Sequence, residues 1–98
     1  MHSLTVLYPN KEGAKFDFEY YMQRHIPLAN GLLGHEFKVT KGIASAQGGQ
    51  PAFLCTARME IGTMEEFLPV LIQHVGALTS DIPNYTNVEP VIQFEESL

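Results

Sequence analysis

The chain has 98 residues, of which 45% are hydrophobic and 17% charged, a composition typical of a packed globular protein and not of a disordered one. Six Lys and Arg against eleven Asp and Glu give a formal net charge of -5, without a basic cluster, so we expect no nucleic acid partner. No apolar run approaches the roughly 20 residues that span a bilayer, so we expect no membrane partner either.

Residues 1–98 are expected to form a single domain, because no linker, repeat or low-complexity tract divides them. Cys55 is the only cysteine and therefore cannot form an internal disulfide. No charged and then apolar signal segment opens the chain. Together these features predict a cytoplasmic location.

The first third of the chain predicts a strand and an interrupted helix. The strand covers Ser3–Tyr8, where β-branched and aromatic residues are followed by a proline. Asp17 is expected to cap a helix whose apolar face comprises Phe18, Tyr21, Met22 and His25. Pro27 removes one backbone donor, so the helix must kink near His25 or restart before Leu28. An irregular turn is thus predicted beside a histidine.

The rest of the chain predicts a hairpin, a second helix and a last strand. The hairpin strands cover Phe37–Ala46 and Ala52–Ile61, with a glycine-rich turn between them. Thr63 and Glu66 match a capping box, and the helix that follows has an apolar face of Phe67, Leu71, Val75 and Leu78. The last strand covers Val88–Glu95. The order βαββαβ predicts an α+β, ferredoxin-like fold: a four-stranded antiparallel sheet with two helices on one face.

Alternation along the predicted strands gives the sheet two different faces. The face under the helices is expected to carry Leu4, Val6, Tyr8, Phe37, Val39, Ile43, Phe53, Cys55, Ala57, Met59, Val88, Ile92 and Phe94. The opposite face is mixed, with Thr5, Leu7, Thr40, Gly42, Ala44, Leu54, Thr56, Arg58, Val91 and Gln93. That second face is too apolar for water, so we expect two copies to stack on it as a homodimer.

Three segments carry a resemblance to a known family. They are the run from Phe16 to Tyr21, the residues His25-Ile26-Pro27-Leu28, and the stretch from Asp81 to Thr86 that leads on to Glu89-Pro90-Val91-Ile92-Gln93. In combination they resemble the EthD family of the dimeric α+β barrel superfamily, over nearly the whole chain. The resemblance implies a barrel made of two chains, with a small apolar pocket between helices and sheet. The wider superfamily includes cofactor-independent oxygenases, polyketide cyclases, lactone isomerases and haem-degrading enzymes.

His25 and Tyr21 are the candidate catalytic residues. Their four-residue spacing places both on the apolar face of the first helix, where an imidazole near neutral pKa suits a general base. His25 could instead hold the kink by bonding a freed carbonyl, and Tyr21 could be core packing. Tyr20 points elsewhere on the helix, so at most one of the two tyrosines can face the site.

Four further residues are candidates for the substrate pocket: Tyr8, His74, Asp81 and Tyr85. Asp81 could orient the imidazole of His74, although an Asp at such a turn more often caps local backbone. Tyr85 suits a hydroxyl at the pocket rim, and its alternative role is to anchor the last strand. His2 and His35 are expected in solvent.

Several kinds of chemistry lack support. The glycine pair Gly48-Gly49 joins two strands and does not precede a helix, so we expect no nucleotide cofactor. Four scattered histidines and one cysteine lack the spacing of a metal site, so no metal is expected, while haem held by one histidine stays open. No Ser or Cys lies in a nucleophile elbow.

Two hypotheses of function follow. In the first, the protein is a cofactor-independent oxidoreductase or isomerase of degradative metabolism that uses His25 as a base on a small apolar substrate. In the second, it is a non-catalytic accessory that binds a hydrophobic compound or supports a partner monooxygenase.

Overall fold

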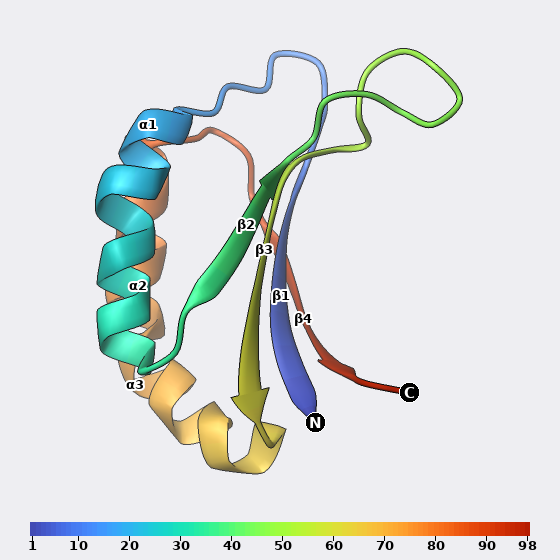
Figure 1. Cartoon of the computed structure of the whole chain (residues 1–98). Helices are drawn as coiled ribbons and strands as arrows, with labels where there is room; N and C mark the ends of the chain where they lie inside the picture. The colour runs from blue at the N-terminus through green and yellow to red at the C-terminus, as the bar shows by residue number, and fades with distance from the viewer.

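The computed structural model describes all of residues 1–98 as a four-stranded antiparallel sheet with its helices on one side (Figure 1). The strands are β1 (His2–Pro9), β2 (Phe37–Lys41), β3 (Phe53–Gly62) and β4 (Val91–Glu96). The helical elements are α1 (Phe18–Tyr20), the π-helical turn η1 (Tyr21–His25), α2 (Ile26–Leu33), α3 (Met64–Asp81) and the 3-10 turn η2 (Ile82–Asn84). The sheet order β2-β3-β1-β4 confirms the ferredoxin-like arrangement.

Strand pairing fixes which residues share a face. Val6 pairs with Ala57 on one side and with Ile92 on the other, so all three face the helices. Buried side chains of this face form two clusters, one around Tyr8, Tyr21 and Cys55 and one around Leu4, Leu33 and Met59. Cys55 is fully buried, which confirms the predicted register of the third strand.

Two predicted strands are too long. β2 ends at Lys41, although the Gly42 N–H still donates to the Leu54 carbonyl at 2.9 Å; a Cβ at Gly42 would collide with the Phe53 carbonyl oxygen. The chain then leaves the sheet, and Ile43, predicted in the core, is 87% exposed. β4 begins only at Val91, after Pro90, which has no N–H to donate to a ladder. Val88 is nevertheless buried.

Of three other predicted core positions, two are more exposed than expected and one is partly buried. Phe53 stands at the start of β3, beside an irregularity in the pairing with β1, and is 40% exposed. Ile92 pairs with Val6 and faces the helices but is 49% exposed. Phe94 is partly buried against Phe67, as expected from its face.

The predicted helix ends are confirmed. The Asp17 carboxylate accepts the Tyr20 N–H at 3.0 Å, and the Thr63 hydroxyl oxygen accepts the Glu66 N–H at 3.3 Å. Gly34 ends α2 in the left-handed conformation that glycine tolerates best. Pro69 lies inside α3, whose first turns run at an angle to the rest (Figure 1). No helix is long and apolar enough to cross a membrane.

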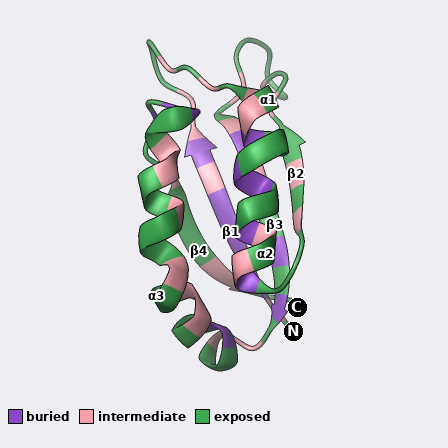
Figure 2. Cartoon of the chain, turned by 90° about the vertical axis from the view of Figure 1, so that its left-hand side faces the viewer, coloured by how far each residue is buried: buried purple, intermediate pink, exposed green.

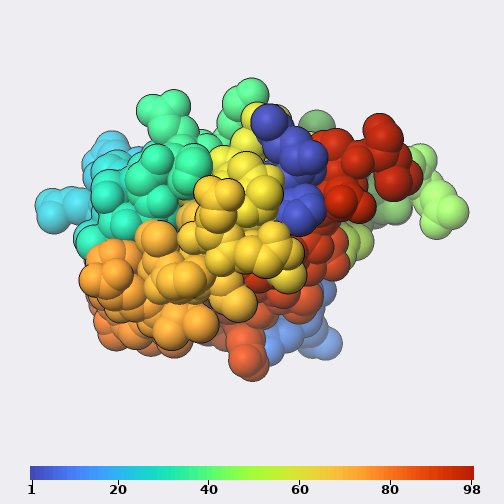
Figure 3. Space-filling model, turned by 90° about the horizontal axis from the view of Figure 1, so that it is seen from below, coloured from blue at the N-terminus to red at the C-terminus, as the bar shows by residue number.

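The sequence predicted that His2 is solvated, but its side chain contacts two other segments of the chain. Its Nδ1 accepts the Met64 N–H at 2.9 Å, and its Nε2 lies 3.3 Å from a Glu96 carboxylate oxygen. In the view from this end of the molecule, the first residues lie between the start of α3 and the last strand (Figure 3). An accepting Nδ1 requires the neutral imidazole.

The face away from the helices is open and mixed in character. Thr5 donates to Glu95, and Arg58 bonds to Ser3 at 3.3 Å and lies 3.8 Å from Glu95. Apolar side chains lie on the same face, at Leu7, Leu54 and Val91. The predicted alternation of this face is therefore present.

Candidate functional site

The π-helical turn η1 brings His25 over Tyr21. The Ile26 N–H bonds to the Tyr21 carbonyl, five residues back, so the turn is wider than an α-helical one. Pro27 follows at the start of α2 and confirms the predicted interruption of the helix. The rings of Tyr21 and His25 stack with centroids 5.4 Å apart and planes 14° apart. Both side chains point inward and are buried.

His25 bonds to the carboxylate at the end of the other helix. Its Nδ1 lies 2.9 Å from Oδ2 of Asp81, the last residue of α3, and His25 is only 7% exposed. The other carboxylate oxygen, Oδ1, accepts the Tyr20 hydroxyl at 2.7 Å and the Asn84 amide at 2.9 Å. Burial alone would raise the pKa of Asp81, but the hydrogen bonds from Asn84, Tyr20 and His25 together hold this pKa below its ordinary value. Asp81 is therefore ionised at neutral pH.

On its other side His25 contacts Tyr85, which in turn contacts Tyr8. The Tyr85 hydroxyl lies 3.5 Å from His25 Nε2 and 2.7 Å from the Tyr8 hydroxyl. Burial raises the pKa of Tyr8, Tyr21 and Tyr85 far above the ordinary tyrosine value. The three phenols therefore stay protonated. A continuous chain of polar contacts thus runs inside the molecule from Asp81 through His25 and Tyr85 to Tyr8.

A cavity of about 60 Å³ lies beside this chain, between the helices and the sheet. It is lined mainly by apolar side chains of α2, α3, β1 and β4, together with Tyr8, Tyr21, His25 and Tyr85. Val75 and Ile92 line it as well and are 41% and 49% exposed, so the cavity reaches the surface between α3 and β4. In Figure 2 the buried part of β1 lies behind the space between α2 and α3.

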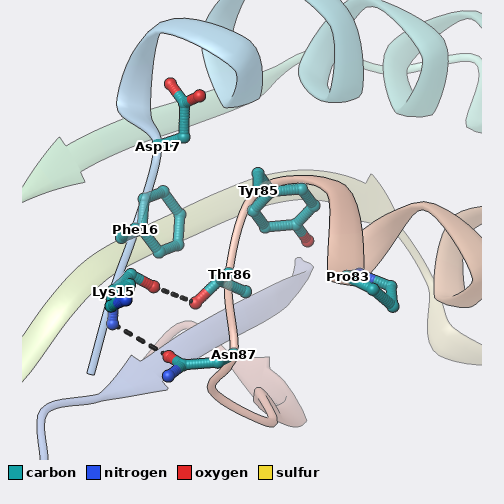
Figure 4. A pocket seen from close by; sticks show the side chains of 7 residues that line it. All are labelled: Lys15, Phe16, Asp17, Pro83, Tyr85, Thr86 and Asn87. Atoms are coloured by element: carbon teal, nitrogen blue, oxygen red, sulfur yellow. Dashed lines mark hydrogen bonds between the residues drawn. The ribbon is translucent and has the colours of Figure 1, made fainter. Parts of the chain in front are cut away.

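A second, larger and open groove also has Tyr85 in its lining (Figure 4). It is lined by Lys15, Phe16, Asp17, Pro83, Tyr85, Thr86 and Asn87. Two hydrogen bonds cross its floor: the Thr86 hydroxyl donates to the Lys15 carbonyl at 2.6 Å, and the Lys15 N–H donates to Asn87 Oδ1 at 2.8 Å. The groove thus marks the contact that anchors the segment carrying Tyr85, and it contains no acid-base pair.

The structure brings together most of the predicted site residues. Tyr8, Tyr21, His25 and Tyr85 line one cavity, and Asp81 bonds to His25 from outside it. The predicted pairing of Asp81 with His74 is wrong: His74 does not line the cavity, and the carboxylate turns to His25 because α3 ends beside η1. The roles of the other residues remain predictions.

Tyr20 and Asn84 were missed as parts of the site. Tyr20 points away from the cavity, as the spacing predicted, but reaches Asp81 from the outside. The only sequence signal for Asn84 was its position three residues after Asp81 in a turn, where an Asp commonly accepts local hydrogen bonds. No group of three or more His, Cys, Asp and Glu side chains could hold a metal ion.

Solved structures resemble this chain over nearly its whole length. An EthD-like protein from Ralstonia eutropha JMP134 is 37% identical, with a TM-score of 0.89, over 97% of this chain and 89% of that chain. An EthD family protein from Bacillus halodurans C-125 shares the fold, at 22% identity and a TM-score of 0.78, over 100% of this chain and 99% of that one. No protein-family model and no curated protein matches. The identity and coverage of the first relative show that the chain belongs to the EthD-like family.

Proposed function

We propose that the protein binds a small apolar molecule in the cavity and acts on it by proton transfer, without a cofactor, with His25 as the general base. The reaction would be of the oxidoreductase or isomerase type, in degradative metabolism. The observation that carries the proposal is the bond between Asp81 and His25 Nδ1, 2.9 Å long, beside a cavity with mostly apolar walls.

Asp81 has two effects on the imidazole. As an ionised carboxylate it can only accept hydrogen bonds, so Nδ1 of His25 carries the proton and Nε2 offers its lone pair. When Nε2 takes a proton, the imidazolium charge is formed next to the negative charge of Asp81. Tyr20 and Asn84 keep that carboxylate in place. Asp81 is therefore a positioning residue, and His25 the residue that exchanges the proton.

The apolar wall supplies the affinity and excludes water. A cavity of about 60 Å³ is much smaller than the roughly 300–1,000 Å³ of a ligand pocket, so it must widen to admit a ligand. The wall that can move is α3, because Phe67 in its first turn is the only buried residue of this helix. Entry is expected between Val75 and Ile92, the exposed apolar members of the lining.

An accessory role without catalysis is the alternative, and one observation favours it. Both ring nitrogens of His25 already have side-chain partners, Asp81 and Tyr85, as they would in a purely structural histidine. In that case the protein would bind a hydrophobic compound or support a partner monooxygenase, and His25 would only shape the cavity.

Binding is tested first, because both functions need it. Ligand-observed NMR with indole and toluene as probes should show binding to the unmodified protein. Val75→Phe places a ring at the mouth and should weaken binding at least tenfold. Ile72→Phe is the matched control, since Ile72 lies on the same helix, is 65% exposed and does not line the cavity. Equal binding by both variants would contradict the cavity as the ligand site.

Catalysis is tested with His25→Gln, which keeps a polar side chain of similar length. Once a substrate is found, loss of a general base should lower the rate about 100-fold or more. The fold, followed by circular dichroism, should stay intact. A variant that binds the probes and turns over substrate normally would favour the accessory role, and a variant that unfolds would indicate a structural histidine.

A homodimer completes the proposal. The open sheet face carries the apolar side chains of Leu7, Leu54 and Val91 as well as polar ones, and it would pack on a second copy. The loop between β2 and β3 projects beyond the sheet on this side (Figure 1), and its exposed Ile43 would contact the partner. Sedimentation at micromolar concentration tests the pairing. Thr56→Lys should dissociate the dimer, Ser80→Lys on α3 should not, and an unmodified monomer of 10.9 kDa would contradict it.

A further inference from the structure

The contacts around His25 fix the direction of the hydrogen bonds in the chain when its imidazole is neutral. In that state ionised Asp81 accepts from Nδ1, so Nε2 has no proton and must accept. Tyr85, 3.5 Å away, then donates to Nε2, and its oxygen is free to accept the proton of the Tyr8 hydroxyl at 2.7 Å. All protons therefore point from Tyr8 toward Asp81.

This direction decides what the end of the chain offers to a ligand. With its own proton given to Tyr85, the Tyr8 oxygen has lone pairs and no hydrogen left to donate. A carbonyl or ether oxygen would face another acceptor there, and burying two acceptors without a shared proton is unfavourable. A ligand with an O–H group would instead extend the chain by one donor.

From this geometry we propose that the site takes a weakly acidic hydroxyl compound, a phenol or an enol, and that Tyr8 and Tyr85 relay its proton to His25. This inference depends on the proposed function, since it needs the cavity to be the ligand site. In the relay the ligand O–H bond breaks and its proton goes to the Tyr8 oxygen. The Tyr8 proton goes to Tyr85, and the Tyr85 proton goes to His25 Nε2.

The products of the relay are a ligand oxyanion and an imidazolium beside Asp81, so the charges balance and no redox partner is needed. Both tyrosines are neutral before and after the step. Burial raises the pKa of each well above the ordinary value, so neither is expected to stay ionised as an intermediate. A concerted transfer along the chain avoids that intermediate.

The acidity of the ligand limits the substrate class. A phenol such as the tyrosine side chain has a pKa of about 10 and imidazolium one of about 6.5, so the transfer is uphill but within reach of an enzyme. An aliphatic alcohol is a much weaker acid. A carboxylate ligand would have to enter an apolar cavity near the negative charge of Asp81, which is costly. The apolar walls suit an aromatic ring or another carbon skeleton around the hydroxyl.

The test compares 4-nitrophenol with 4-nitroanisole, its methyl ether, which has no proton to give. Nitrophenol turns yellow when it ionises, so one absorbance titration reports both binding and proton transfer. At a pH where free nitrophenol is mostly neutral, binding to the unmodified protein should produce the yellow form. The ether should bind at least tenfold more weakly.

Tyr85→Phe breaks the relay and leaves the apolar walls intact. Nitrophenol should still bind to this variant but should stay colourless, and the preference over the ether should shrink. Because this variant removes a buried hydroxyl, thermal melting checks its fold, and the comparison of the two ligands in the unmodified protein stands without it.

The outcomes separate the two proposals. Equal binding of phenol and ether without colour would overturn the relay, while the cavity remained the ligand site. If neither compound binds and Val75→Phe changes nothing, the proposed function fails and the relay with it. Yellow nitrophenol that persists in Tyr85→Phe would contradict the path through Tyr85.

Discussion

The two helical segments that cover the sheet are packed very differently. The segment of residues 18–33, formed by α1, η1 and α2, buries five side chains: Tyr21, His25, Ile26, Ala29 and Leu33. α3 is 18 residues long and buries only Phe67. Figure 2 shows the contrast, with buried colour on the inner side of η1 and α2 and little on α3.

α3 has a buried anchor in its first turn and a hydrogen-bonded anchor at its last residue, while Val70, Leu71 and Leu78 between them are only partly buried against the core. Phe67 anchors its first turn in the apolar core, and Asp81 ties its last residue to His25 and Tyr20 by hydrogen bonds. Between these two points lies the cavity, lined by Leu71, Val75 and Leu78. The candidate base His25 thus lies on the more buried helical segment, opposite the less buried wall formed by α3. This division is what a site needs that must both orient a base and admit a substrate.

The rate of thiol labelling should differ most between the core under residues 18–33 and the exposed side of α3. Cys55 lies on β3 and packs in one cluster with Tyr21 and Ile26 of the more buried helical segment. Burial raises its pKa to about 12. Against an ordinary thiol near 9, the thiolate fraction is then about a thousandfold lower at pH 8. In Val75→Cys, the new thiol on α3 should react at least a thousandfold faster than Cys55. Similar rates for both thiols would contradict the comparison and the register of β3.

Matched leucine truncations measure the packing itself. Leu33→Ala on α2 removes a side chain that is 3% exposed and should lower the free energy of unfolding by about 3 kcal/mol. Leu68→Ala on α3 removes one that is 37% exposed and should cost less than about 1 kcal/mol. Urea denaturation gives both values. Equal losses would mean that α3 is packed as tightly as α2.

The tie at the end of α3 should depend on pH. The folded-state pKa of Asp81 is lowered, so its contribution to stability is present above the ordinary Asp pKa of about 3.9 and is lost as the pH falls through the lower folded value. Asp81→Asn should cost about 2 kcal/mol at pH 7, because bonds to a charged group are lost. The cost should shrink near pH 3. A cost that is the same at both pH values would contradict an ionised tie.

The cap at the start of α3 should make a small contribution to stability and none to ligand binding. Thr63→Ala removes the oxygen that accepts the Glu66 N–H and should cost about 1 kcal/mol. Thr63→Ser keeps that oxygen and serves as the control. Since the cap lies outside the cavity, probe binding should be unchanged in both variants. Weaker binding in Thr63→Ala alone would show that the first turn of α3 shapes the cavity.

The fold followed from sequence because local signals agreed with one another. Alternation placed Val6, Ala57 and Cys55 on the buried face, and capping residues at Asp17 and Thr63 marked both helix starts. The failures lie where a long-range contact decides. β2 ends at Lys41, where Gly42 passes too close to the Phe53 carbonyl for a Cβ, and nothing local in the sequence announces that approach.

The same limit applied to the site. Spacing within one helix placed Tyr21 beside His25, but the partner of Asp81 is 56 residues away and depends on how two helix ends meet. His74 is nearer to Asp81 in the sequence, and sequence distance therefore favoured the wrong histidine. The hydroxyl pair of Tyr8 and Tyr85, 77 residues apart, was equally out of reach of any spacing rule.

The account rests on the state of one imidazole, and long-range proton–nitrogen NMR of His25 measures it directly. For the neutral imidazole we expect a single tautomer with the proton on Nδ1 and an unprotonated Nε2 that accepts from Tyr85, because Asp81 accepts from Nδ1. Asp81→Asn should release that constraint and yield a mixture of tautomers. A proton on Nε2 of the unmodified protein would contradict both the base and the relay.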